Sequence, residues 1–72
     1  MDDKEIYIKA LGQRIKQIRN SLGMNQREFA SNVGLDERHL RRIEKGKANP
    51  TISTLYDIIT FSKGDFGQFF EL

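Results

Sequence analysis

The stretch GLDERHLRRIEKGK, residues 34–47, carries three arginines, two lysines and one histidine around three aliphatic side chains. An arginine fork matches the O6 and N7 acceptors of guanine in the major groove of DNA, and it also pairs with the oxygens of a phosphate. If these bases share one helix face, their chemistry suits the edge of a DNA duplex. A row of arginines on a helix is, however, also typical of a merely solvated surface.

The charge of the chain is unevenly placed. Its net charge is +2, but residues 9–47 carry ten Lys or Arg and four acids, whereas residues 1–8 and 48–72 each carry one base and three acids. A basic centre between acidic ends is typical of a surface that binds a polyanion.

Several kinds of chemistry are excluded by composition. The chain has no cysteine and a single histidine, His39, so the sequence predicts neither a metal site nor a disulfide, and we expect no cofactor. The available nucleophiles are hydroxyls, and there is no Gly-rich phosphate loop, so we expect no enzymatic activity. The acidic MDDKEI start and the lack of a long apolar run predict a soluble, cytoplasmic protein without a membrane segment.

The 72 residues predict one domain, residues 1–72, whose small core supplies only about 3–5 kcal/mol. Its first helix is predicted from about Asp3 to Leu22, because apolar residues recur at steps of four, three and four. These residues are Leu11, Ile15, Ile18 and Leu22. Asp2 or Asp3 can cap the start of this helix, and Gly12 inside it lowers helix propensity.

Three later helices are predicted to begin after the caps Asn25, Asp36 and Thr51, and Gly64 is expected to end the third of them. In that helix the expected buried face consists of Ile52, Leu55, Ile58 and Ile59. A fifth short helix is expected from Asp65 to Phe70. The predicted fold class is therefore all-α, a compact arrangement of five short helices.

The connection Val33-Gly34-Leu35 is so short that the helices on either side must cross steeply, and Gly34 permits the corner. The predicted helix-turn-helix spans residues 25–45. In its second helix Leu40 and Ile43 fall on the inward side, and the basic residues Arg38, Arg41, Arg42 and Lys45 gather on the opposite side.

These features form a linked set that resembles the Cro/C1-type helix-turn-helix family (XRE, lambda-repressor-like) of transcription regulators. The resemblance runs from about Leu11 to Phe70. It includes Gln26, the Phe29-Ala30 pair, the Gly34-Leu35 corner, the Ile43-Glu44-x-Gly46 exit and the Asn49-Pro50 segment. It implies a sequence-specific regulator that binds double-stranded DNA through the second helix of the motif.

The resemblance also implies roles for particular residues. Those expected to reach base edges are Glu37, Arg38, His39 and Arg42, with Arg41 beside them. Those expected to hold phosphates are Gln26, Arg27, Lys45, Lys47 and Asn49, and Gln26 is also expected to brace the second helix of the motif. Arg19 and Glu44 are expected to form a structural pair. Glu37 can accept from cytosine N4 or simply favour the helix dipole, and His39 can lie near phosphate or remain a surface residue.

Five aromatic residues crowd the last part of the chain, and a single small core cannot easily bury them all. They are Tyr56, Phe61, Phe66, Phe69 and Phe70. Either two or three complete the core, or residues 56–72 form a dimerisation segment of a homodimer that reads a palindromic operator. Residues 1–10 extend the first helix, and Ile6, Tyr7 and Ile8 can pack on the core or add to a partner surface.

Three identities remain open within this class: a phage-type repressor, a restriction-modification controller, or an antitoxin with a toxin as protein partner. The small size and aromatic tail slightly favour the controller. The alternative is a protein-interaction module that kept the fold without binding DNA, although such a module would have little reason to keep a basic helix face.

Overall fold

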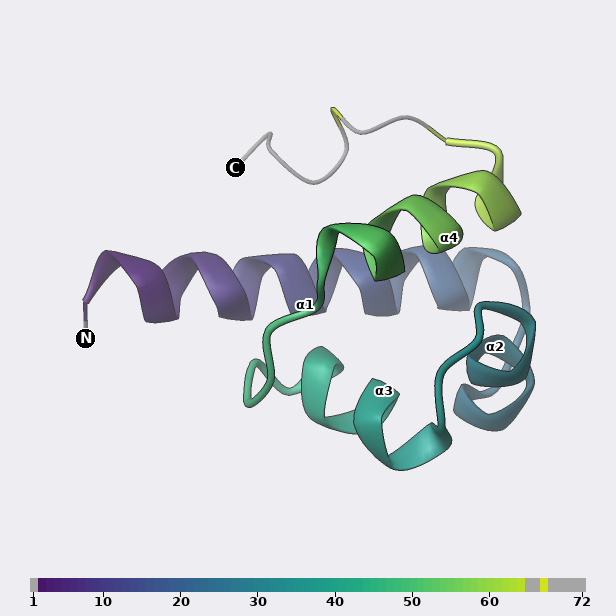
Figure 1. Ribbon diagram of the computed structural model, residues 1–72, viewed down its shortest axis with the longest axis horizontal. Helices are drawn as coiled ribbons and strands as arrows, with labels where there is room; N and C mark the ends of the chain where they lie inside the picture. Colours follow the sequence, from purple (N-terminus) through teal and green to yellow (C-terminus); the bar gives the residue numbers. More distant parts are fainter. Residues whose placement is uncertain (1, 65–66, 68–72) are drawn as a thin grey trace.

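The computed structural model describes residues 2–64 and residue 67, and this part of the chain contains four helices and no strand. They are α1 (Asp3–Ser21), α2 (Gln26–Asn32), α3 (Glu37–Glu44) and α4 (Ile52–Ser62) (Figure 1). The all-α prediction is confirmed for these residues, with four helices rather than the expected five. The fifth helix, expected from Asp65 to Phe70, falls outside the described residues except for Gly67.

Each helix begins at a side-chain cap, because the first amides of a helix have no partner within it. The caps and the amides that they accept from are Asp2 Oδ1 and Glu5 N at 2.8 Å, Asn25 Oδ1 and Glu28 N at 2.8 Å, Asp36 Oδ1 and His39 N at 2.9 Å, and Thr51 Oγ1 and Thr54 N at 3.0 Å. At α2 the two residues form a reciprocal capping box, because the Asn25 backbone amide in turn donates to Glu28 Oε1 at 3.1 Å. The predicted helix starts are thus confirmed.

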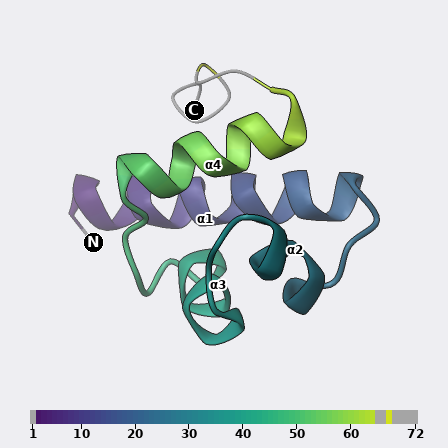
Figure 2. The ribbon, with the colours of Figure 1, turned by 45° about the vertical axis from the view of Figure 1, so that its right-hand side comes forward.

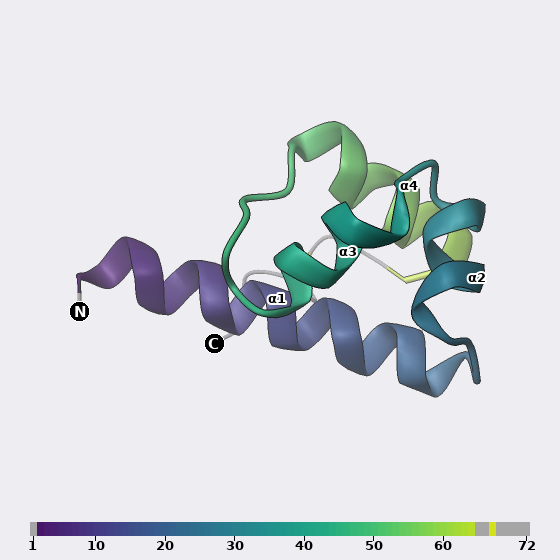
Figure 3. The ribbon, with the colours of Figure 1, turned by 90° about the horizontal axis from the view of Figure 1, so that it is seen from below.

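The long helix α1 runs behind the other three: α4 lies above it and α2 and α3 below it in Figures 1 and 2, and the view from below shows all three on the same side of α1 (Figure 3). The core forms where these helices meet, and its largest fully buried side chains are Ile15, Phe29, Leu40, Ile43 and Ile58. In α3 the predicted inward positions Leu40 and Ile43 are buried. Of the apolar stripe predicted in α1, Leu11 and Ile15 are buried and Ile18 is partly buried, whereas Leu22 is 39% exposed.

Gly12 allows α1 and α3 to approach closely. A Cβ atom built on Gly12 would lie 2.2 Å from the Ile43 carbonyl oxygen and 3.1 Å from that of Glu44. The glycine that looked like a weak point of the first helix is therefore required by the packing of α1 against the end of α3.

Two expectations about α4 are wrong. Ile52 is 68% exposed rather than buried, because the first turn of α4 extends to an open groove beside the start of α1 instead of covering the core. Lys63, not Gly64, takes the left-handed conformation that ends the helix, at φ 61°. The Gly64 amide then donates to the Ile59 carbonyl at 3.1 Å.

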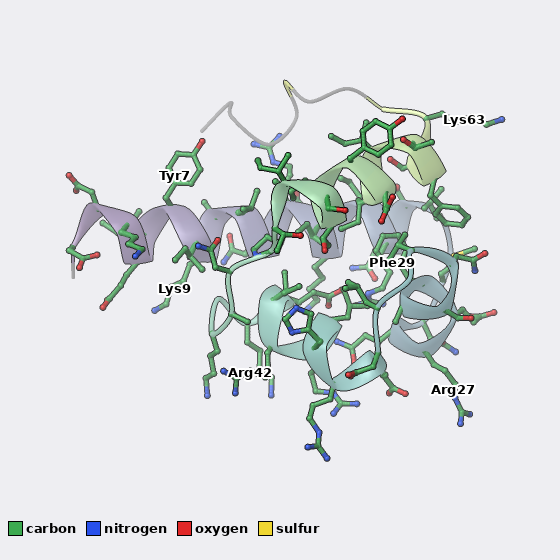
Figure 4. All side chains as sticks on the ribbon, viewed as in Figure 1. Tyr7, Lys9, Arg27, Phe29, Arg42 and Lys63 are labelled. Carbon is green, nitrogen blue, oxygen red and sulfur yellow. The ribbon has the colours of Figure 1, made fainter. Side chains whose placement is uncertain are left out.

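The groove, of about 750 Å³, lies between the first half of α1 and the start of α4. Its apolar lining comes from Tyr7, Ile8, Leu11, Pro50, Ile52 and Leu55. Tyr7 projects from α1 on the side where α4 lies (Figure 4). Tyr7 and Ile8 are half-buried whereas Ile6 is exposed, so the extension of α1 packs partly on the domain and partly faces solvent.

Among residues 2–64 and 67, no helix is long and apolar enough to cross a membrane. The same part of the chain contains no group of three or more acidic, histidine or cysteine side chains that could hold a metal ion.

Candidate nucleic-acid interface

The corner between α2 and α3 is built by Gly34. Its φ of 76° is a left-handed conformation that glycine adopts without steric cost, and the following Leu35 amide donates to the Ala30 carbonyl at 2.9 Å. The chain therefore turns sharply after α2, and only four residues separate α2 from α3. This is the helix-turn-helix that the sequence predicted.

The corner fixes which side of α3 faces outward. Leu40 and Ile43 are fully buried and Glu44 is nearly so, whereas Arg38, Arg41, Arg42 and Lys45 are exposed. Figure 3 views the molecule from the side on which α3 lies. Arg42 of α3 and Arg27 of α2 point away from α1 on that side (Figure 4). The two helices thus present one basic surface.

Beneath this surface, Arg19 of α1 and Glu44 of α3 form a buried ion pair. Arg19 Nε donates to Glu44 Oε2 at 2.8 Å and Nη2 to Oε1 at 3.0 Å, a bidentate geometry. Arg19 Nη1 also donates to the Met24 carbonyl at 3.0 Å. The hydrogen bond and charge of Glu44 raise the pKa of Arg19 despite the opposing effect of burial. The two residues that were expected to pair are therefore in contact.

Gln26, the first residue of α2, joins this pair to the outer face of α3. Its Nε2 donates to Glu44 Oε1 at 3.1 Å, and its Oε1 accepts a long contact from Arg41 Nε at 3.5 Å. Arg41 Nη2 in turn donates to Glu37 Oε2 at 2.8 Å. Hydrogen bonds thus run from the core to the basic surface.

The contact of Glu37 with Arg41 was not predicted, although a signal was present, because an acidic residue four positions before an arginine is the favoured arrangement of an ion pair on a helix. The resemblance implied that Gln26 braces the second helix of the motif. The structure identifies its partner there as Glu44, on a different helix and 18 positions away.

The remaining polar residues of the basic surface differ in whether their side chains make hydrogen bonds within the protein. Arg42 Nη2 donates to the Lys47 carbonyl at 3.1 Å and so holds the loop after α3. Lys45, Lys47 and Asn49 are exposed around that loop. Within the described part of the chain, the exposed side chains of Arg38 and His39 make no hydrogen bond or ion pair.

A helix-turn-helix with an outward basic second helix defines the class of DNA-binding helix-turn-helix proteins. The sequence profile of one such family, HTH_3 (helix-turn-helix), matches residues 15–61. The chain belongs to this family, whose members are DNA-binding transcription regulators.

Two curated relatives are transcription regulators of this type. The uncharacterized HTH-type transcriptional regulator y4dJ of Sinorhizobium fredii is 32% identical over 50 residues, which are 69% of this chain and 65% of that protein. PuuR of Escherichia coli is 34% identical over 62 residues, 86% of this chain and 34% of that protein. The chain therefore spans less than two thirds of either relative.

Solved structures share the fold. An HTH_3 family transcriptional regulator from Vibrio cholerae superimposes with a TM-score of 0.83 at 28% identity, over 93% of this chain and 38% of that one. The restriction-modification controller protein C.AhdI from Aeromonas hydrophila gives 0.80 at 22% identity, over 86% and 94%. A point mutant of the controller protein C.Esp1396I gives 0.78 at 30% identity, over 89% and 81%.

Proposed function

We propose that the protein is a sequence-specific transcription regulator that binds a palindromic operator as a homodimer, with α3 of each protomer in the major groove. The observation that carries this proposal is the division of α3 into a buried apolar side and an exposed basic side, held by the corner at Gly34. A recognition helix needs this arrangement, because its outward residues must meet base edges.

Arg38 is the leading base-reading residue. It lies in the first turn of α3, it is exposed, and its guanidinium has no partner within the described residues that DNA would have to displace. Glu37, His39 and Arg42 complete the base-reading set, with Arg41 beside them. The set assigned to phosphates is Gln26, Arg27, Lys45, Lys47 and Asn49.

The homodimer is supported by apolar side chains that α4 leaves exposed. Tyr56 is 57% exposed, and the assigned Phe66, Phe69 and Phe70 lie outside the described residues. Phe61 contributes to the core, because its ring packs edge-on against Phe29 at a centroid distance of 6.1 Å. A two-fold dimer would place its recognition helices about 34 Å apart, one turn of DNA.

The operator test is selection of bound duplexes from a random DNA library at two salt concentrations. We expect a palindromic consensus whose half-sites are about one helical turn apart. Recovery of no consensus, with binding that vanishes at moderate salt, would mean that α3 is only a charged surface and would overturn the proposal.

Two variants, measured on the selected operator and on random DNA, distinguish base-reading residues from phosphate contacts. Arg38→Ala should cost about 1–3 kcal/mol of specific affinity and relax the preference at one base pair. Lys47→Ala should weaken binding on all sequences alike and lower the slope of log K against log salt by about 0.9. Equal losses on operator and random DNA for Arg38→Ala would contradict the base-reading role.

Among the narrower identities, the comparisons favour a restriction-modification controller. The C.Esp1396I structure is 30% identical and this chain covers 81% of it, so the likeness extends over most of a controller protein. The test is a gel-shift titration of the protein on DNA from upstream of its own gene, with shuffled DNA as control. A controller should bind the upstream DNA selectively, and equal binding to both would count against this identity.

A further inference from the structure

One guanidinium of the basic surface is already paired in the absence of DNA. Arg41 Nη2 lies 2.8 Å from Glu37 Oε2, and the two side chains are 44% and 42% exposed. The Arg41 Nε atom faces Gln26 Oε1 at 3.5 Å. Arg41 is therefore drawn toward Glu37 and the start of α2, unlike Arg38, which has no such partner within the described residues.

The orientation of the Gln26 amide is determined by its neighbour. Both carboxyl oxygens of Glu44 accept hydrogen bonds from Arg19, so this side chain acts as an acceptor toward its neighbours. Gln26 must therefore turn its Nε2 toward Glu44, at 3.1 Å, which leaves its Oε1 on the side of Arg41. This oxygen cannot donate to a phosphate, so in this orientation Gln26 does not make the phosphate contact assigned to it above, and Arg41 is the donor at this edge of the surface.

We propose that Arg41 is a phosphate contact for which Glu37 competes with DNA, so that Glu37 sets the ratio of specific to non-specific affinity. This inference rests on the proposed function and deepens it. A carboxylate and a phosphate offer similar oxygen pairs to one arginine fork, so the fork serves one of them fully at a time. Arg41 contacts Glu37 through Nη2 alone, so DNA of any sequence whose phosphate takes both arms of the fork displaces Glu37 from Nη2.

The displaced carboxylate meets different surroundings on different sequences. On random DNA it is left beside a polyanion without a donor, which weakens binding. On an operator with a cytosine at the facing position, the N4 amino group can donate to Glu37. Glu37 is thus a specificity-determining residue, and Gln26 is a positioning residue that acts through Arg41.

The test is a double-mutant cycle of Glu37→Gln and Arg41→Met, with dissociation constants measured on the selected operator and on a random duplex over a range of salt. Because an exposed ion pair is weak, Glu37→Gln should tighten random binding by about two- to fivefold. The same substitution should not raise the affinity for the operator. The ratio of operator affinity to random-duplex affinity should therefore fall. Arg41→Met should lower the salt slope by about 0.9 on both duplexes.

The decisive comparison is Glu37→Gln in the Arg41→Met background. In the Arg41→Met background, the change that Glu37→Gln makes in affinity for random DNA should shrink to the change made by Asp57→Asn. Asp57→Asn is the control, because it removes the same charge at an exposed position of α4. Thermal unfolding shows that each variant is folded, and Arg41→Lys provides a second variant that keeps the charge without the fork. It should retain the salt slope but lose most of the response to Glu37→Gln.

Two results would overturn the inference. An equal effect of Glu37→Gln with and without Arg41 would show that Glu37 acts by direct repulsion of DNA. A changed base preference with an unchanged salt slope for Arg41→Met would make Arg41 a base reader. If the unmodified protein binds no duplex, the proposed function itself fails, and this is seen before any variant is compared.

Discussion

At the scale of single residues, the buried pair of Arg19 and Glu44 links α1, α2 and α3. Arg19 joins three parts of the chain, because it donates to Glu44 in α3 and to the Met24 carbonyl between α1 and α2. Glu44 in turn accepts from Gln26 of α2. Removal of either charge leaves the other in a site that water barely reaches.

We expect Arg19→Met to lower the free energy of unfolding by about 3–5 kcal/mol, because it leaves an uncompensated buried carboxylate. Because the core of so small a domain supplies only about 3–5 kcal/mol, circular dichroism should show this variant largely unfolded even without urea. Lys16→Met, at an exposed position of the same helix, is the matched control and should change stability little. Similar small losses for both variants would show that the pair does not support the fold.

The same pair predicts that its contribution to stability does not change at mildly alkaline pH. Glu44 raises the pKa of Arg19 in the folded protein, so the arginine's contribution is fully present below the unfolded pKa and is lost only as pH rises through the folded one. Both values lie in the strongly alkaline range. The urea midpoint of the unmodified protein should therefore change little from neutral to mildly alkaline pH, and a steady decline there would contradict this view.

Gly12 provides a second prediction at this scale. Gly12→Ala raises helix propensity by about 1 kcal/mol, but its Cβ would meet the Ile43 carbonyl oxygen at 2.2 Å. Since two backbones must separate to make room, we expect a net loss of about 1–3 kcal/mol in urea unfolding. Gln13→Ala, at the exposed neighbouring position, is the control. A Gly12→Ala variant as stable as the original would mean that α1 and α3 can separate without cost.

At the scale of elements, α3 depends on its cap as much as on its buried side. Asp36 Oδ1 accepts from the His39 amide at 2.9 Å, and the helix has only eight residues. We expect Asp36→Ala to cost about 1 kcal/mol of stability and to increase amide hydrogen exchange in the first turn of α3. Asp36→Asn, which keeps an acceptor oxygen, should restore most of the protection, and failure to do so would implicate charge rather than capping.

The sequence sufficed to predict the elements whose signals are local. Helix caps, the corner at Gly34 and the inward positions of Leu40 and Ile43 follow from turn chemistry and helix periodicity within a few residues. The exposure of Ile52 did not follow, because it depends on where α1 lies relative to α4. The left-handed Lys63 did not follow either, since glycine is normally favoured there and Gly64 stood next to it.

The site was predictable to a similar degree. The periodicity of α3 placed its basic residues on the outside, but it could not separate Arg38 from Arg41 and Arg42. That distinction depends on partners, namely Glu37 and Gln26 for Arg41 and the Lys47 carbonyl for Arg42. Contacts between helices of this kind require the three-dimensional arrangement.

At the scale of the whole molecule, the proposed dimer has a thermodynamic signature. If folded protomers associate, the midpoint of thermal unfolding should rise with protein concentration. Tyr56→Ser combined with Phe69→Ser should abolish that dependence, whereas Ser53→Ala on the exposed surface of α4 should not. Analytical ultracentrifugation over the same concentrations gives the oligomeric state, and a monomer throughout would contradict the dimer.

The buried pair of Arg19 and Glu44 also limits how this sequence can change over generations. Well-packed apolar residues at both positions are often as stable as a buried ion pair, or more so. Every path to them nevertheless begins with one substitution that costs about as much as the whole core of so small a domain supplies. Natural descent by single substitutions therefore cannot easily leave the present pair, even where a better solution exists, whereas a designer who changes both codons together can reach it in one step.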